Sequence, residues 1–226
     1  MSKHKFHIIL PLRKNSKRIK NKNTIRINKK MLFEYTLEKI NIKNYNYITY
    51  ISSDDAKIER WCRNKNIIYS KRSKGNSSDF STTENAIVET INNNKKFITI
   101  DNYSHIILLQ CTSPLRNSND IEKCIKFYLE GKYDSVFSGV YNKNLFWKKY
   151  KSKLTPINYN FLNRKREQDM KYQIIENGSI YIFSTKKFLK YRNRLFGKIG
   201  IYPMSKLNSL QIDEKEDILL LKKFLK

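Results

Sequence analysis

Residues 6–10 read FHIIL, and residues 11–23, which follow directly, read PLRKNSKRIKNKN. The first stretch is a short apolar run typical of a buried strand, and the second is a basic loop that contains Ser and Asn. Eleven Lys and Arg precede the first acidic residue, Glu34. A strand that ends in such a loop before a helix places backbone N–H groups and cations where a polyphosphate can bind. The stretch therefore favours a nucleotide-handling enzyme, with a solvated basic terminus as the alternative.

Strand and helix patterns alternate along the rest of the chain. Strands are predicted at residues 6–10, 47–51, 67–69, 105–109, 135–140, 179–183 and 199–202. Helices are predicted at residues 31–40, 56–64, 83–92, 121–129 and 216–225. This alternation is typical of an α/β fold with a mostly parallel sheet and helices on both faces. Residues 141–177 are aromatic and basic without clear periodicity, and they predict an irregular lobe, a dimerisation arm or a lid.

Polar clusters follow four of the predicted strands. They lie at residues 13–23, 52–55, 71–72 and 110–116. Each cluster alone is compatible with ordinary loop chemistry, such as a helix N-cap or a Ser-Pro turn. Ligands of parallel α/β sheets bind at the carboxyl ends of the strands, so the four clusters together predict one binding site at that edge.

The composition limits the possible functions. The 226 residues fit one domain, 1–226, and 46 Lys and Arg against 20 Asp and Glu give a net charge of +26. Such a charge favours an anionic partner. The excess is spread along the chain, however, and Lys, Asn, Ile and Tyr are all abundant, as AT-rich codons would produce. We therefore expect no specific nucleic-acid binding.

The cysteines and histidines do not predict a metal site or a hydrolase triad. Cys62, Cys111 and Cys124 form no CxxC pair, and the three histidines are scattered. No apolar run approaches the roughly 20 residues that a membrane helix needs. We expect a soluble, cytoplasmic protein with reduced thiols and no membrane partner.

Six segments, in this order, carry a resemblance to a known family. They are residues 11–23, 52–54 (SSD), 72–83 (RSKGNSSDFSTT), 108–116 (LLQCTSPLR), 166–169 (REQD) with 176–182 (ENGSIYI), and 212–217 (IDEKED). The segment LLQCTSPLR is nearly diagnostic. Over essentially its whole length the chain resembles the acylneuraminate cytidylyltransferases, or CMP-sialic acid synthetases, including the relatives that activate legionaminic and pseudaminic acids.

The resemblance implies a Rossmann-like nucleotidyltransferase fold, with a mostly parallel mixed sheet flanked by helices and a small dimerisation and sugar-binding lobe at 141–177. It implies transfer of CMP from CTP to the anomeric hydroxyl of a sialic-acid-like nine-carbon 2-keto sugar acid, with release of pyrophosphate and with Mg²⁺ as cofactor. It also implies a homodimer in which the segment before Asn177 crosses to the partner subunit. The product would serve cell-surface glycan synthesis.

The resemblance further implies roles for individual residues. Catalytic roles fall to Arg13, Lys17, Lys22 and Asp213. Nucleotide contacts fall to Arg13, Ser16, Lys17, Lys22, Asn23, Arg72, Thr83 and Gln110. Sugar contacts fall to Gln110, Arg166, Gln168, Asn177 and Tyr181. The magnesium ligands are Asp213 and Gln211.

The residue types suit these roles. Arg offers a fork and Lys a point charge to phosphate, amides can pair with a pyrimidine edge, and a carboxylate is a hard ligand for Mg²⁺. Asn177 and Tyr181 have the same parity on a predicted strand, so we expect both to project to one face. The ordinary alternatives are a helix-capping role for Thr83 and Asp217 and a core position for Tyr181.

Four positions depart from the family pattern. Arg18 replaces a small Gly and crowds or recharges the triphosphate loop, and Gln211 replaces the first of two metal-binding Asp residues, so the metal loses one charged ligand. Cys111 replaces a Pro, and Glu167 replaces an Arg. Three other functions stay open: a nucleotidyltransferase for another sugar such as 3-deoxy-octulosonate, a basic nucleic-acid-binding protein, and a homologue that binds nucleotide without turnover.

Overall fold

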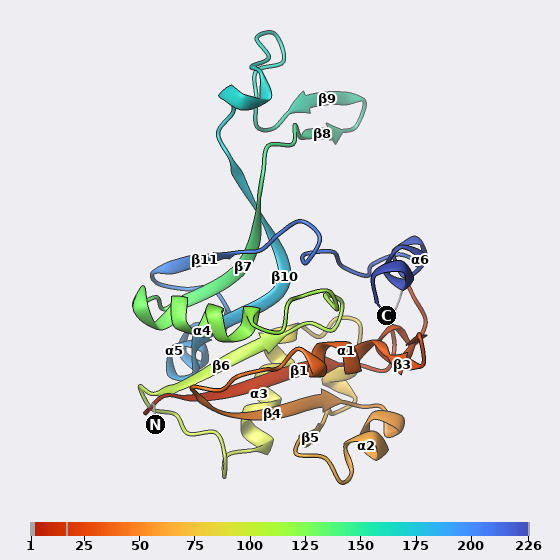
Figure 1. Cartoon of the computed structure of the whole chain (residues 1–226), viewed down its shortest axis with the longest axis vertical. Coiled ribbons are helices and arrows are strands. Elements are labelled where there is room, and N and C mark those ends of the chain that lie inside the picture. The colour runs from red at the N-terminus through yellow and green to blue at the C-terminus, as the bar shows by residue number, and fades with distance from the viewer. Residues whose placement is uncertain (1–2, 17, 226) are drawn as a thin grey trace.

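A seven-stranded sheet forms the centre of the protein in a computed structural model, which describes residues 3–16 and 18–225 (Figure 1). The strands follow the order β11-β7-β10-β6-β1-β4-β5 across the sheet. Their bounds are β1 Lys5–Leu12, β4 Asn46–Ser53, β5 Ile68–Lys71, β6 Ser104–Leu109, β7 Ser135–Asn142, β10 Gln173–Ser184 and β11 Ile199–Pro203. Strand β10 runs antiparallel to β6 and β7, and the other neighbouring pairs are parallel. The predicted mixed, mostly parallel sheet is confirmed.

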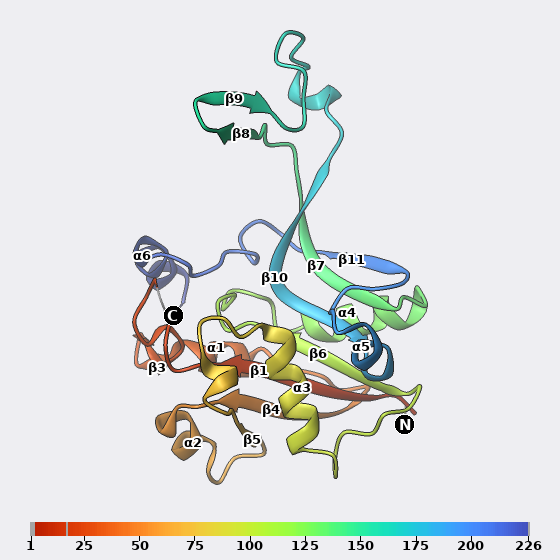
Figure 2. The ribbon, with the colours of Figure 1, turned by 180° about the vertical axis from the view of Figure 1, so that it is seen from behind.

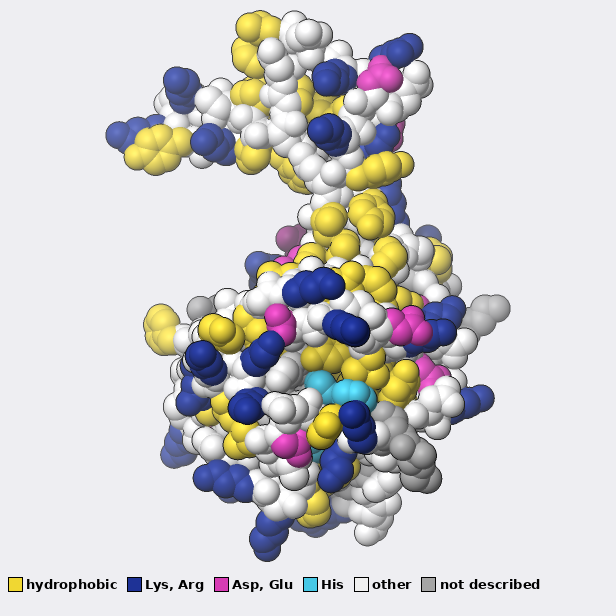
Figure 3. Space-filling view, turned by 90° about the vertical axis from the view of Figure 1, so that its left-hand side faces the viewer, with side chains coloured by type: hydrophobic (Ala, Val, Ile, Leu, Met, Phe, Trp, Pro, Cys, Tyr) yellow, Lys and Arg dark blue, Asp and Glu magenta, His cyan; other side chains and the backbone are white. Residues whose placement is uncertain are grey.

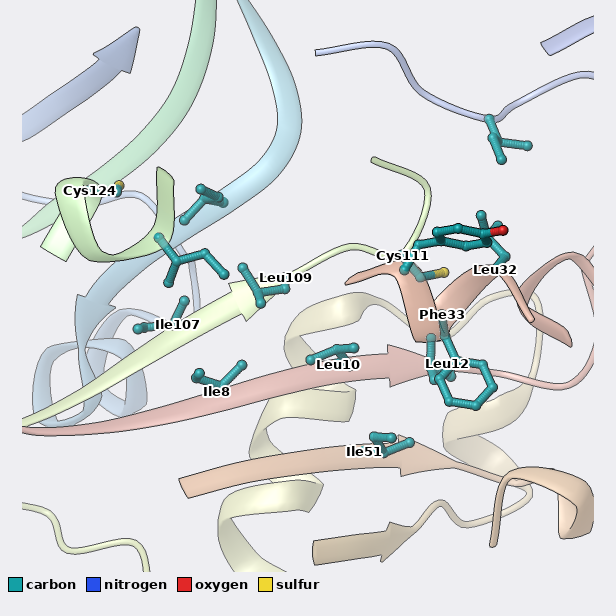
Figure 4. Packing of buried hydrophobic residues seen from close by; sticks show 14 of the residues in the cluster. Ile8, Leu10, Leu12, Leu32, Phe33, Ile51, Ile107, Leu109, Cys111 and Cys124 are labelled. Carbon is teal, nitrogen blue, oxygen red and sulfur yellow. The ribbon is translucent and has the colours of Figure 1, made fainter. Parts of the chain in front are cut away.

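Helices cover both faces of the sheet (Figures 1 and 2). Their bounds are α1 Leu32–Glu38, α2 Ala56–Cys62, α3 Thr83–Asn93, α4 Asp120–Glu130, α5 Thr185–Tyr191 and α6 Lys215–Phe224. Buried side chains of α1, α2, α4 and α6 pack into one apolar cluster, part of which Figure 4 shows, and those of α3 and α5 pack into a second. Along β1, Ile8 and Leu10 lie in the first cluster and Ile9 in the second. Both faces of this strand are therefore buried, which explains its unbroken apolar run.

Two local features differ from the sequence prediction. Helix α5 was not predicted, because its sequence, TKKFLKY, has no extended apolar stripe; the Ser184 side chain caps it by accepting from the Lys187 N–H at 3.4 Å. Helix α3 begins at Thr83 as predicted, but its N-cap is Thr82, whose hydroxyl oxygen accepts from the Asn85 N–H at 3.2 Å. The capping alternative for Thr83 is thus wrong, and its hydroxyl is not used as the cap.

An arm projects from the sheet where β7 and β10 continue past their neighbours (Figure 1). It carries the hairpin of β8 (Trp147–Tyr150) and β9 (Lys153–Pro156) and the short 3-10 helix Glu167–Asp169. Large apolar side chains on it are exposed, among them Tyr150 at 72% and Leu162 at 82%. The irregular segment 141–177 of the sequence is therefore an arm with an uncovered apolar surface.

A short hairpin of β2 (Arg26–Ile27) and β3 (Lys30–Met31) lies between the first loop and α1. Its small size and its polar composition explain why the sequence pattern missed it. In the described part of the chain, none of the helices combines the length and the apolar character needed to cross a bilayer.

Candidate active site

A cavity of about 470 Å³ opens at the carboxyl ends of β1 and β6. Its lining comes from five separate parts of the sequence: Pro11, Arg13, Ser16, Arg18, Ile19, Lys22, Asn23, Arg72, Asp79, Ser81, Thr83, Gln110, Cys111, Thr112 and Asp213. We call it the nucleotide cavity. It brings together every residue predicted to be catalytic or to contact the nucleotide except Lys17, which lies outside the described residues.

Cations outnumber acids in the lining of the nucleotide cavity. Four basic side chains face two carboxylates, those of Asp79 and Asp213. The Arg13 guanidinium donates to Asp79 Oδ1 at 2.9 Å, which fixes its direction. The Lys22 ammonium donates to the Ile212 carbonyl at 2.9 Å and to Asp213 Oδ1 at 3.3 Å. Lys22 thus links the first loop to the segment before α6. The lining as a whole keeps a net positive charge, because four cations face two carboxylates.

Arg72 is a buried cation in the wall of this cavity. It is only 7% exposed, and its Nε–H has no hydrogen-bond partner among the described residues. Burial lowers the pKa of Arg72, yet a guanidinium stays charged at neutral pH. Arg72 also lines the cavity, so a carbonyl or phosphate oxygen of a ligand at this wall would meet a charged guanidinium that solvent screens little.

The Asn23 amide joins the two main loops of the site. Its Nδ2 donates to the Arg13 carbonyl at 2.7 Å, and its Oδ1 accepts from the Cys111 thiol at 2.9 Å. An amide has two N–H donors and two acceptor sites, so one of each is left for a ligand. That Asn23 pairs with a pyrimidine edge stays a prediction, and the structure adds a role in holding the loops together.

A glycine lets two glutamines approach each other behind this cavity. Gly178 has φ +64° and lies at an irregularity of β10, where the pairing with β7 shifts register between Glu176 and Tyr181. A Cβ at Gly178 would lie 2.7 Å from Gln110 Oε1 and 2.8 Å from Gln211 Nε2. Both the positive φ and the close approach require Gly here.

Arg116 supports the site from within the core, a role that the sequence reasoning did not assign. It is fully buried, and it donates to the Gln110 carbonyl at 2.7 Å and to the Ser179 carbonyl and hydroxyl at 3.0 Å each. No described carboxylate lies within ion-pair distance of it. Burial lowers its pKa to about 10, which keeps it charged at neutral pH. Its position in the motif LLQCTSPLR was the available signal, but the sequence did not show that this Arg is internal.

A second cavity of about 480 Å³ adjoins the first. Its lining is Val140, Asn142, Asn144, Ile175, Glu176, Asn177, Lys206, Ser209, Leu210, Gln211 and Asp213, and we call it the polar cavity. The Asn177 amide is fixed there, because its Oδ1 accepts from the Ser138 hydroxyl at 2.6 Å and its Nδ2 donates to the Ser209 hydroxyl at 2.8 Å. Asp213 lines both cavities, so the two meet at its carboxylate.

Tyr181 does not lie on the surface that Asn177 presents. It is 3% exposed, packs in the second apolar cluster, and donates its hydroxyl to Glu176. Burial raises its pKa. The predicted shared face is wrong because the irregularity at Gly178 breaks the two-residue periodicity of the strand. The core position, which was the ordinary alternative, is the one observed.

Arg166 and Gln168 lie at the 3-10 helix Glu167–Asp169 of the projecting arm and line neither cavity of the same chain. Figure 2 shows the arm extending away from the sheet. Arg166 Nε is 2.8 Å from Asp169 Oδ2, and Gln168 is exposed in the adjoining 3-10 helix. The structure therefore does not bring these two predicted sugar-binding residues to the site of their own subunit.

The magnesium ligands predicted from the sequence fit a site with a single carboxylate. Asp213 is about half exposed, and its carboxylate lies 3.3 Å from Lys22 Nζ and 3.7 Å from Arg18 Nη1. Gln211 lines the polar cavity. No group of three or more His, Cys, Asp or Glu gathers among the described residues, so phosphate oxygens and waters would have to complete the shell. Asp217 has the capping role considered for it, since its Oδ2 accepts from the Asp213 N–H at 2.7 Å and the Glu214 N–H at 2.8 Å.

Comparison with known proteins agrees with this arrangement. A family model described as cytidylyltransferase matches residues 7–226. The chain belongs to the cytidylyltransferase family. Similar curated proteins are named N-acylneuraminate cytidylyltransferase: form A from Danio rerio is 31% identical over 147 residues, covering 63% of this chain and 33% of that protein. The enzyme of Escherichia coli O18:K1:H7 is 27% identical over 223 residues, covering 94% and 50%. The cytidylyltransferase chain thus spans half or less of the length of these relatives.

Solved structures of low sequence identity share the fold. CMP:2-keto-3-deoxy-manno-octonic acid synthetase, solved in complex with CTP, matches with a TM-score of 0.68 and 13% identity over 98% of both chains. A 4-diphosphocytidyl-2C-methyl-D-erythritol synthase matches with a TM-score of 0.73 and 9% identity over the whole of both chains. The predicted nucleotidyltransferase fold is confirmed for this cytidylyltransferase.

Proposed function

We propose that this cytidylyltransferase transfers CMP from CTP to the anomeric hydroxyl of a sialic-acid-like nine-carbon sugar acid, releases pyrophosphate, and acts in the cytoplasm for cell-surface glycan synthesis. One observation carries the proposal: a cationic cavity and a polar cavity meet at one carboxylate, that of Asp213. Two substrates can then face each other across it. The name N-acylneuraminate cytidylyltransferase, which the similar curated proteins bear, supports the sugar class.

The chain's own residues explain how the reaction would proceed. Attack of the sugar hydroxyl on the α-phosphorus needs positioning and charge neutralisation. Arg13 and Lys22 are fixed by hydrogen bonds in the nucleotide cavity and would neutralise the triphosphate and the departing pyrophosphate. Asn177, fixed in the polar cavity, would orient the sugar. Asp213 with Gln211 would hold Mg²⁺, which lowers the charge on the phosphate oxygens.

A panel of substrates tests the proposed reaction. We expect pyrophosphate release only when CTP, Mg²⁺ and a sialic-type sugar are all present. Each cavity would bind one of the two substrates, and Mg²⁺ is the proposed cofactor. The measurement is a coupled pyrophosphate assay with CTP, UTP, GTP and ATP against N-acetylneuraminate, its legionaminate and pseudaminate relatives, and 3-deoxy-octulosonate. Turnover with UTP or GTP but not CTP would refute the proposed base. Turnover with 3-deoxy-octulosonate alone would support the alternative sugar.

We further propose that the protein is a homodimer formed through the arm. The exposed apolar side chains of the arm support this, because soluble proteins rarely leave such a surface uncovered. The positions of Arg166 and Gln168 support it as well. These side chains are remote from the cavities of their own subunit, but on an arm that crosses to a partner they can approach the partner's sugar site.

Sedimentation at micromolar concentration tests the dimer. We expect a mass twice that of the 27.1 kDa chain. Replacing two exposed arm residues, Trp147→Glu with Leu162→Glu, should give monomers, because buried carboxylates oppose association. Phe97→Glu is the control, since Phe97 is half exposed but lies outside the arm. A wild-type protein that sediments as a monomer, or an arm variant that stays dimeric, would contradict the proposal.

A further inference from the structure

A third cavity, of about 790 Å³, lies at the amino ends of the strands, at the edge of the sheet opposite the active site. We call it the amino-end cavity. It is formed by the start of β1, the start of β6, the last turn of α4 and helix α5. His105 at its base and Gln110 in the nucleotide cavity stand five residues apart along β6, about 17 Å. The cavity is therefore separate from both active-site cavities.

The floor of the amino-end cavity is polar, uncharged and fixed. His4 Nδ1 lies 2.8 Å from His105 Nε2, and His105 Nδ1 lies 3.1 Å from the Tyr128 hydroxyl. His105 and Tyr128 are 5% and 3% exposed, and the ring of Phe6 stacks on His105 at 5.2 Å. Burial lowers the pKa of His105 to about 4, so its ring is neutral at pH 7. Both ring nitrogens of His105 are engaged in these bonds, and the Tyr128 hydroxyl keeps one hydrogen-bonding position in a defined place without a charge.

The rim of the same cavity is cationic. Its lining includes four lysines, at positions 132, 186, 187 and 190, against one carboxylate, Asp134. That carboxylate is already engaged by the Lys187 ammonium and by the Lys198 N–H at 2.9 Å. Figure 3 shows this face, with histidines near its centre beside apolar side chains and with Lys and Arg around them. The rim thus keeps an excess of positive charge that no described acid neutralises.

We propose that the amino-end cavity is a second ligand site, which binds a small phosphate monoester such as a sugar phosphate. The lysine rim attracts and holds a phosphate dianion. One hydroxyl of the attached sugar is matched by the remaining hydrogen-bonding position of the Tyr128 phenol. The volume is within the range of small-molecule sites. Because no active-site residue takes part, the proposal does not depend on the reaction proposed above.

Histidine resonances give a local test. The chain has three histidines, and His7 is the internal reference, because it is 1% exposed on β1 and does not line the cavity. In an NMR titration of the whole protein with glucose 6-phosphate, we expect the ring signals of His4 and His105 to move together while those of His7 stay. Affinity should exceed that for inorganic phosphate by about fivefold, because the sugar adds a hydrogen bond to the Tyr128 hydroxyl.

Paired variants separate the site from the general positive charge of the protein. The double change Lys186→Ala with Lys190→Ala should weaken glucose 6-phosphate binding by about tenfold or more, since two phosphate contacts are lost. The control is Lys95→Ala with Lys96→Ala, which removes the same charge from an exposed turn away from the cavity. Absence of movement at His4 and His105, equal weakening in both doubles, or equal affinity for inorganic phosphate would each overturn the proposal.

Discussion

Asp213→Asn is expected to remove most turnover, with kcat falling by about 10²- to 10³-fold. The amide keeps the volume of the side chain but lacks the charge that would hold Mg²⁺ where the two cavities meet. The KM for CTP should change less, because contacts such as that of the buried Arg72 do not use this carboxylate. Steady-state kinetics over a magnesium titration would separate the two effects.

Two companion variants make the test of Asp213 specific. Glu216→Gln removes an exposed carboxylate near the start of α6, the helix that follows Asp213, and should leave kcat unchanged. Gln211→Asp adds a second carboxylate beside the proposed metal position and should lower the magnesium concentration needed for half-maximal rate. A near-wild-type rate for Asp213→Asn would mean that the metal is held elsewhere. Asp54, whose carboxylate accepts from the Lys14 N–H at 2.7 Å, would then be the next candidate.

The sequence predicted the sheet well because its central strands, such as β1 and β6, are buried on both faces. Each of the seven expected apolar runs lies within or largely within a strand of the sheet. Strand β10 is the partial exception, since it starts at Gln173 whereas the prediction began at 179. Its first half belongs to the arm, where burial does not impose an apolar pattern. Helix α5 was missed for a related reason. Apart from Tyr191 at its end, its apolar side chains are Phe188 and Leu189, which are adjacent in sequence and do not form a stripe along the helix.

The candidate site could be predicted only where it depends on topology. The carboxyl ends of parallel strands meet at one edge, so residues as distant in sequence as Arg13, Arg72 and Gln110 could be expected in one cavity. Asp213 follows no strand directly, and only the family resemblance predicted it for this site. The position of Tyr181 could not be predicted, because a single residue with positive φ reverses the facing of the strand beyond it. The buried position of Arg116 was also not predictable, since Arg is rarely fully buried without a carboxylate partner.

Two of the four departures from the family pattern act in one direction at the proposed metal position. Arg18 brings a guanidinium to 3.7 Å from Asp213 Oδ1, and Gln211 supplies an amide where a carboxylate is usual. Both reduce the negative charge available to a divalent cation. Since the Arg18 side chain is 70% exposed, solvent screens its interaction with Asp213 and the side chain can move away when a triphosphate binds. The arrangement would therefore weaken the proposed magnesium binding without blocking the cavity.

Lys22→Met should lower kcat/KM by about 10²-fold, because it removes a point charge that lines the nucleotide cavity and, on the proposed function, would face the triphosphate. The Lys22 side chain is 16% exposed, so solvent compensates less for its loss than at an open surface. The same change releases the Asp213 carboxylate from a cation 3.3 Å away, so half-maximal activity should need less Mg²⁺ even as the maximal rate falls. These opposite shifts distinguish a residue that contacts both the phosphate and the Asp213 carboxylate from one that only stabilises the loop.

Lys20→Met, an exposed change in the same loop, is the control for net charge. An unchanged kcat/KM for Lys22→Met would show that this ammonium does not act on the nucleotide. An equal fall for Lys20→Met would show that the net charge of the loop acts, and not this ammonium in particular.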